Sequence, residues 1–306
     1  EAFAKADKPF FQYVAFTAAH WPIHAPEKSI RKYIKTYEGG WEKLRNERYE
    51  RMLKMGIIDK ERWPLPPLES RVKPWDTIDH KPWRIRNMAV YAAMVDHMDQ
   101  AVGAIVRALE KTKQLDDTLI IYFHDNGACP EHLSGNGWNT ANNILAKAKK
   151  AGKTIAVGDK FDFPMGGPMT YCSVGHKCAN AQNTPMRRYK MNVNNRGAGT
   201  PAIVHWPAGL KTKSGSISGQ RGHVIDMMAT CLELAGAKYP KEFNGKETKP
   251  HESFSLVPIL KGKTVGRDHA YVFNHGGTHA IVKGEYKIVR EGRRPWALYH
   301  LTEDRT

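Results

Sequence analysis

The chain has 306 residues, 41% of them hydrophobic and 25% charged, with a formal net charge of +16. This length and composition exclude a disordered chain, and four cysteines are too few for a small scaffold built on disulfides. The positive charge predicts attraction to polyanions, which include nucleic acid, anionic membranes and sulfated or phosphorylated substrates. Because the basic residues are scattered rather than gathered in one block, charge alone does not select among these partners.

The first predicted element is an interior strand over residues 9–16, Pro-Phe-Phe-Gln-Tyr-Val-Ala-Phe. The loop that follows, residues 17–26, contains two prolines, which fix its backbone, and presents His20, Trp21 and His24 at a strand end. A histidine in this position could donate a proton to a leaving group near neutral pH, or it could simply hydrogen-bond a carbonyl in a stiff loop.

Helical patterns follow the loop. Residues 27–58 predict charged helices broken at Gly39 and Gly40, and the prolines between residues 63 and 83 predict a long irregular excursion. From residue 87 to 111 the apolar positions recur at alternating four- and three-residue steps. This spacing predicts an amphipathic helix lying on a sheet.

Residues 119–127, Leu-Ile-Ile-Tyr-Phe-His-Asp-Asn-Gly, are the centre of the predicted fold. The apolar run predicts a buried parallel strand of an α/β sheet. Ligands of such sheets gather at the carboxyl ends of the strands, so Asp125 and Asn126 are candidate oxygen ligands of Ca²⁺, which needs more oxygens than this pair supplies. The alternative is an Asx turn, in which these side chains bond nearby backbone N–H groups.

A cationic stretch follows the long irregular segment from residue 128 to 183, in which residues 140–151 are predicted to be helical. Arg187, Arg188 and Lys190 fall within four residues. Near a strand-end carboxylate they could hold a divalent oxyanion, and otherwise they form a basic surface turn. The four cysteines show no paired C-x-x-C zinc spacing, and Cys172 and Cys178 could form a disulfide or stay buried thiols.

The last third of the chain predicts a strand, a helix and a small sheet. Residues 200–206 form the strand, and residues 224–235 form the helix, which Gly236 caps. His275 lies on a Gly-containing turn of the small sheet, where it is a candidate substrate contact or a solvated turn residue. The predicted strands of this sheet are residues 270–273, 278–282, 286–289 and 297–300.

Several of these stretches occur in the order and at the spacing of a known family, and the chain resembles the type I, formylglycine-dependent sulfatases, in particular the arylsulfatase-like and glycan-sulfatase branches. The resemblance implies an alkaline-phosphatase-like α/β sandwich over residues 1–262, with a central mixed, mostly parallel sheet, and a small antiparallel subdomain over residues 263–306. The matching stretches are residues 19–26, 123–127, 183–190, 201–207 and 223–236, with continuity to residue 301.

The resemblance also implies a set of functional residues. Asp125 and Asn126 correspond to Ca²⁺ ligands, His20 to the group that protonates the leaving oxygen, and Lys190 to the group that contacts the sulfate. Candidate substrate contacts are Trp21, His24 and His275. The implied partner is a sulfated small molecule or glycan rather than nucleic acid, and the implied location is periplasmic or secreted.

The nucleophile of that family is a formylglycine made from Cys/Ser-x-Pro-x-Arg, and no such sequence occurs here. Residues 183–187 have the spacing but begin with Asn, which offers no thiol or hydroxyl to oxidise. The paired aspartates that complete the metal site and the Lys-x-His segment are missing too. We therefore expect residues 1–306 to be the later portion of a sulfatase, inactive alone.

Two other functions stay open. A phosphomonoester or phosphodiester hydrolase of the same superfamily would need its own nucleophile and usually more His and Asp metal ligands. A non-catalytic module could instead use the basic surface to bind polyanions.

Overall fold

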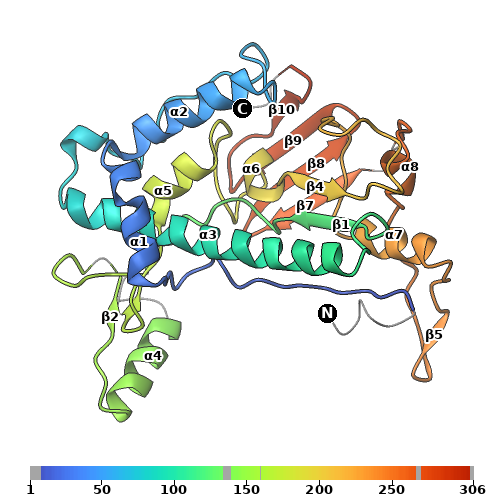
Figure 1. Cartoon of the computed structure of the whole chain (residues 1–306). Coiled ribbons are helices and arrows are strands. Elements are labelled where there is room, and N and C mark those ends of the chain that lie inside the picture. The colour runs from blue at the N-terminus through green and yellow to red at the C-terminus, as the bar shows by residue number, and fades with distance from the viewer. Residues whose placement is uncertain (1–7, 134–138, 159, 267–269, 304–306) are drawn as a thin grey trace.

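The computed structural model describes residues 8–133, 139–158, 160–266 and 270–303 and shows an α/β protein with a separate antiparallel sheet near its C-terminal end (Figure 1). The predicted α/β class and the C-terminal sheet are confirmed. The described helices are α1 (Glu27–Ile34), α2 (Gly40–Lys54), α3 (Lys81–Lys111), α4 (Asn139–Lys150), α5 (Gly175–Gln182), α6 (Asn195–Ala198), α7 (Asp226–Leu234) and α8 (Val257–Leu260). The short 3₁₀ helices are η2 (Lys35–Tyr37) and η3 (Trp75–Thr77).

The strands of the described chain form four small sheets. β1 pairs with β4, β2 with β3, β5 with β6, and the last four strands lie in the order β10-β9-β8-β7. Their bounds are β1 (Ile120–Phe123), β2 (Ala156–Val157), β3 (Thr170–Tyr171), β4 (Ala202–His205), β5 (Glu242–Phe243), β6 (Lys246–Glu247), β7 (Tyr271–His275), β8 (Thr278–Lys283), β9 (Tyr286–Glu291) and β10 (Ala297–His300).

The predicted helices of the first half of the chain are present, including the break at Gly39 and Gly40, but α3 begins at Lys81, inside the predicted irregular excursion, because Pro82 lies in the first turn of the helix, where a missing N–H costs nothing. Gly40 has φ +71°, and a Cβ there would lie 2.1 Å from the ring of Trp75, so only glycine fits. Trp41, beside this glycine, is fully buried and packs edge to face on Trp75. Cys178 of α5 belongs to the same cluster, which fixes the helix that leads toward the cationic stretch.

The predicted pairing of the central strand is wrong. β1 is antiparallel to β4, with Ile120 opposite His205, and its residues are half-buried rather than fully buried. Helix α3 runs beside the strand (Figure 1), and the hydroxyl of Tyr122 reaches Met98 of this helix at 3.9 Å. An apolar run specifies burial, but the direction of the partner strand depends on a segment 80 residues away.

The predicted strand at residues 9–16 is also wrong for the described chain. This segment runs extended along the outside of the molecule, without ladder pairing, and Phe11 and Tyr13 are 76% and 75% exposed. Apolar and aromatic residues suit a strand, but a strand forms only where a partner backbone takes its hydrogen bonds.

The C-terminal sheet has a small hydrophobic core of its own, in which Ala280 and Val289 pack with Val193, three residues after Lys190. His223, just before α7, stacks on Tyr271 of β7 with ring centroids 5.6 Å apart. The four predicted strands are confirmed by β7–β10, whereas the boundary between residues 262 and 263 stays a prediction. All four cysteines are free thiols, and none of the helices described is long and apolar enough to cross a bilayer.

Lys287 of β9 is an uncommon feature of this small sheet, because its ammonium is buried. The residue is 4% exposed, and Nζ donates to Oδ1 of Asn195 at 3.1 Å. Burial, with a smaller contribution from the charge of Arg221, lowers the pKa of Lys287 to about 8 from 10.5. The folded protein therefore holds this proton less tightly than the unfolded chain does.

This depressed pKa predicts a rise in stability at alkaline pH. Between pH 8 and 10.5 the unfolded chain binds more protons at Lys287 than the folded chain, so the free energy of unfolding increases by about 3 kcal/mol from this group. Lys287→Met removes that increase. Urea denaturation at a series of pH values measures the difference between the two proteins.

Lys283→Met provides the matched control, because Lys283 is exposed at the end of the neighbouring strand β8. This variant should keep the alkaline rise of the wild type. If the free energy of unfolding changed with pH in the same way in the wild type and in Lys287→Met, burial of the Lys287 ammonium would not destabilise the protein.

Candidate active site

The loop of residues 17–26 is held rigidly against the segment that contains β3. Ile23 is 1% exposed, and its N–H donates to the carbonyl of Cys172 at 3.0 Å. The N–H of Ala25 donates to the carbonyl of Gly166 at 3.0 Å. These contacts fix the backbone on one side of His20.

The cationic stretch is tied to the segment after β1 by one buried amide. Asn183 is 2% exposed; its Oδ1 accepts from the N–H of Ala128 at 3.0 Å, and its Nδ2 donates to the carbonyl of Arg188 at 2.7 Å. The N–H of Lys190 donates to the carbonyl of Ala128 at 3.0 Å. The two segments therefore form one unit.

The structure brings His20 and Lys190 together, although 170 residues separate them. Nζ of Lys190 lies 3.0 Å from Nε2 of His20, and Nδ1 of His20 lies 2.8 Å from the carbonyl oxygen of Trp21. A carbonyl oxygen only accepts, so Nδ1 carries the imidazole proton, and an ammonium only donates, so Nε2 accepts. This assignment makes His20 neutral, with the mobile proton of the pair on Lys190.

Glu131 completes the cluster and was not predicted from the sequence. Its Oε2 accepts from the indole N–H of Trp21 at 2.6 Å and from the thiol of Cys129 at 2.9 Å, and it lies 3.9 Å from Nζ of Lys190. Burial alone would raise the pKa of this carboxyl, but these hydrogen bonds and the charge of Lys190 outweigh burial and hold the pKa of Glu131 below its usual range. Glu131 is therefore ionised at neutral pH.

Cys129 lies in the cluster but has the wrong protonation state for a nucleophile. Burial and the hydrogen bond to Glu131 raise the pKa of Cys129 to about 11. The thiolate is the reactive form of cysteine, and at neutral pH this side chain stays a thiol. Its chemical role is to donate a hydrogen bond to the carboxylate.

Asp125 and Asn126 follow β1, where the turn is held by the hydroxyl of Thr200, which donates to the carbonyl of His124 at 2.5 Å. Asp125 is exposed and Asn126 is half-buried. Their oxygens match the preference of Ca²⁺, but no group of three or more His, Cys, Asp or Glu that could hold a metal ion occurs in the described ranges. The described residues around Asp125 and Asn126 therefore supply only part of a metal shell, and the role of this pair stays a prediction.

The three predicted substrate contacts lie in different surroundings. Trp21 is half-buried, with its indole bonded to Glu131 and its ring edge on Tyr171 at 5.9 Å. His24 lies 2.6 Å from the carbonyl oxygen of Thr170 and anchors the loop. His275 is exposed at the end of β7, and among the interactions of the described residues none joins it to His20 or Lys190.

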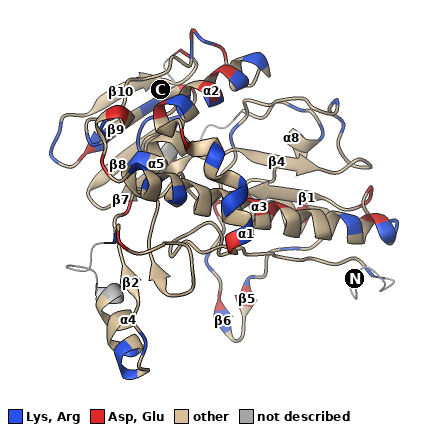
Figure 2. Cartoon of the chain, turned by 60° about the vertical axis from the view of Figure 1, so that its left-hand side comes forward, with Lys and Arg blue, Asp and Glu red and all other residues tan. Residues whose placement is uncertain are grey.

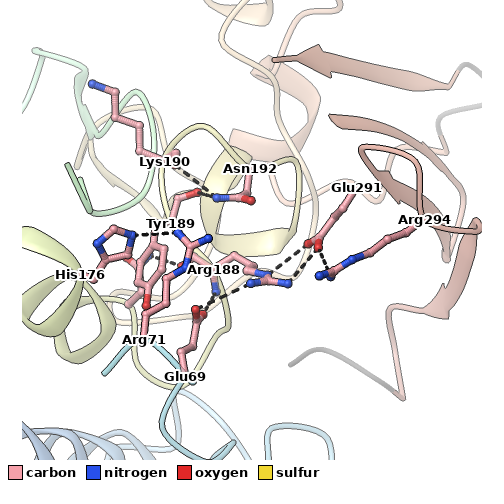
Figure 3. A network of polar contacts seen from close by, with 10 residues as sticks. Glu69, Arg71, His176, Arg188, Tyr189, Lys190, Asn192, Glu291 and Arg294 are labelled. Atoms are coloured by element: carbon pink, nitrogen blue, oxygen red, sulfur yellow. Dashed lines mark hydrogen bonds and ion pairs between the residues drawn. The ribbon is translucent and has the colours of Figure 1, made fainter. Parts of the chain in front are cut away.

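The other face of the cationic stretch binds the C-terminal sheet through Arg188 (Figure 3). Its guanidinium donates to both oxygens of Glu291 at 3.1 and 2.8 Å, and its backbone N–H donates to Glu69 at 2.8 Å. These contacts hold Arg188 at φ +70°, in the left-handed region that an L residue seldom adopts. Figure 3 shows the side chain of Lys190 pointing away from this ion-pair network.

Comparisons with known proteins agree on one family. A family model described as Sulfatase matches residues 1–237. An uncharacterized sulfatase of Schizosaccharomyces pombe is 31% identical over 305 residues, which cover 97% of this chain and 53% of the relative. An arylsulfatase of Klebsiella aerogenes is 28% identical over 265 residues, which cover 84% of this chain and 53% of the relative.

The fold is similar to that of a solved structure. The crystal structure of Ps i-CgsB superposes with a TM-score of 0.57 at 19% identity, covering 98% of this chain and 45% of that one. At this identity the likeness concerns the fold alone, and it confirms the predicted fold class. The chain spans about half the length of the curated relatives it matches.

The ion pairs of Arg188 predict a measurable contribution to stability. Arg188→Ala should lower the free energy of unfolding by about 1–2 kcal/mol, because it removes two charge-assisted hydrogen bonds from the partly buried Glu291. Both residues carry a Cβ, so the backbone strain at this position is unchanged. Urea denaturation measures the loss.

Arg294→Ala is the matched control. Arg294 contacts the same carboxylate at 2.9 Å, but its side chain is 71% exposed, so its removal should cost less than about 0.5 kcal/mol. Equal losses in the two variants would contradict a special role for Arg188.

Proposed function

The chain belongs to the sulfatase family, and from this membership we propose that the intact protein hydrolyses sulfate esters. The contact between Nζ of Lys190 and Nε2 of His20 at 3.0 Å is the observation that carries the proposal. It gives the protein a neutral imidazole and an ammonium in hydrogen-bond contact, in a partly exposed position.

In this proposal the departing oxygen takes its proton from the His20–Lys190 pair. When the sulfur–oxygen bond breaks, negative charge grows on the leaving oxygen, and a nearby ammonium stabilises that charge. Lys190 holds the proton in the resting arrangement, and Nε2 of His20 orients it. Because Nδ1 of His20 is fixed on the carbonyl of Trp21, the imidazole cannot turn its acceptor nitrogen away from Lys190.

Other parts of the site are proposed to come from beyond these 306 residues. The nucleophile is a formylglycine outside this chain, and Asp125 and Asn126 are two of several ligands of one Ca²⁺, which supplies positive charge for the sulfate oxygens. The name of the Klebsiella relative makes an aryl sulfate the first substrate to test, with a sulfated glycan as the second. Periplasmic or secreted location stays a prediction from the family.

The proposed roles predict large losses of activity. In the intact protein, His20→Ala and Lys190→Ala should each lower kcat/KM for an aryl sulfate by roughly 100- to 10,000-fold, because each removes half of the proton-donating pair. Sulfate release measures the rate. His97→Ala is the control, because His97 is exposed on α3 and contacts only Ser29 among the hydrogen bonds of the described chain.

Phosphate ester hydrolysis without sulfate release would favour the phosphohydrolase alternative. Binding of sulfated glycans with no turnover in the intact protein would favour a polyanion-binding module. Lys and Arg residues spread over α1, α2, α3, α4 and the C-terminal sheet (Figure 2), so binding of this kind should weaken uniformly as salt increases.

Metal removal gives a separate prediction. Chelation should abolish sulfate release by the intact protein, and added Ca²⁺ should restore it, because the sulfate oxygens need a cation that this chain ligates only in part. Asp125→Ala should raise the Ca²⁺ concentration needed for half-maximal activity. Full activity after exhaustive chelation would eliminate the calcium proposal and leave the sulfatase proposal standing.

A further inference from the structure

The carboxylate of Glu131 contacts one side chain from the loop of residues 17–26 and one from the cationic stretch. Glu131 lies in the irregular segment after β1, and its side chain is 12% exposed. Three donors surround a single oxygen, Oε2: the indole of Trp21 at 2.6 Å, the thiol of Cys129 at 2.9 Å and the ammonium of Lys190 at 3.9 Å.

The backbone of Glu131 is fixed as firmly as its side chain. The hydroxyl of Ser173 donates to the carbonyl of Glu131, and Pro130 beside it is buried. A glutamate that is held at both its backbone and its side chain has little conformational freedom. Its carboxylate can therefore fix the positions of the donors that bind it. Two of these partners, Trp21 and Lys190, lie on the loop of residues 17–26 and on the cationic stretch, which have no direct backbone hydrogen bond to each other among the described residues.

The contact with Trp21 extends the influence of Glu131 to His20. The indole of Trp21 is bound by Glu131, while the carbonyl of Trp21 accepts from Nδ1 of His20 at 2.8 Å. The position of the Glu131 carboxylate therefore affects where Trp21 lies, and the carbonyl of Trp21 determines which nitrogen of His20 carries the proton. The same carboxylate attracts the ammonium that donates to the opposite nitrogen of that imidazole.

We propose that Glu131 is a positioning residue that holds the Lys190 ammonium against Nε2 of His20 and, through Trp21, keeps the His20 proton on Nδ1. It acts through these groups and does not touch the reacting atoms. The inference rests on the proposed function for its kinetic consequence, but its structural part concerns the tautomer of His20 and is independent of activity.

Glu131→Gln is the decisive variant, because the amide oxygen can still accept from the indole and only the charge is lost. In the intact protein it should lower kcat for an aryl sulfate by about 10- to 100-fold with little change in KM. Glu131→Asp, which keeps the charge, should recover part of the loss.

Glu303→Gln is the matched control, because Glu303 is exposed in the C-terminal sheet region and, among the contacts of the described residues, its carboxylate is paired with His300. It removes the same charge and should leave kcat unchanged. If Glu131→Gln lowers thermal stability but keeps the wild-type kcat, the role of Glu131 is purely structural and the proposal is overturned.

A second measurement separates this inference from the sulfatase proposal. Nitrogen-15 NMR of histidine-labelled protein reports which imidazole nitrogen carries the proton, with the His20 signal assigned by its loss in His20→Ala. The wild type should show the Nδ1–H form, and Glu131→Gln should show a mixture of the two tautomers. This result can be obtained even if the protein releases no sulfate, and an unchanged tautomer in Glu131→Gln would refute the positioning role.

Discussion

The geometry of the candidate site depends on the buried side chain of Asn183. Its amide accepts from Ala128 and donates to Arg188, and these two hydrogen bonds join the segment after β1 to the cationic stretch. A buried amide that lost either partner would leave an unsatisfied polar atom at a cost of about 1–3 kcal/mol. Asn183 therefore favours one relative position of the two segments, and in that position Lys190 reaches His20.

The two arms of the cationic stretch have different partners: Arg188 binds carboxylates, and Lys190 contacts His20. Arg188 binds Glu291, which ties the stretch to β9 of the C-terminal sheet, and Glu69 in the irregular segment before η3. The side chain of Lys190 points the other way (Figure 3). Val193 then enters the core of that sheet between Ala280 and Val289. Since ion pairs and apolar packing hold the stretch from one side, the small sheet is part of the support for the site rather than an independent appendage.

Local patterns predicted the helices and the C-terminal strands, because a period of 3.6 or 2 and the glycine turns are encoded within each segment. Residues 9–16 and the pairing of β1 were predicted wrongly, since strand pairing depends on distant segments. His20 and Lys190 were found by motif. Glu131 could not be found in this way: its main partner, Trp21, lies 110 residues away, and only the fold shows that one carboxylate serves both loops.

The charges at the site argue for a cation in the complete protein. Lys190 contributes one positive charge, Glu131 cancels it at 3.9 Å, and His20 is neutral in the hydrogen-bonded arrangement. Asp125, on the adjoining turn, adds a negative charge, so these four groups together repel an oxyanion. The net charge of +16 is spread over the whole chain and does not remedy this local balance. A divalent ion held by Asp125 and Asn126 would make the local charge positive. The carboxylate of Asp125 alone repels a sulfate ester, but with the ion bound to it the same carboxylate would help to bind the ester.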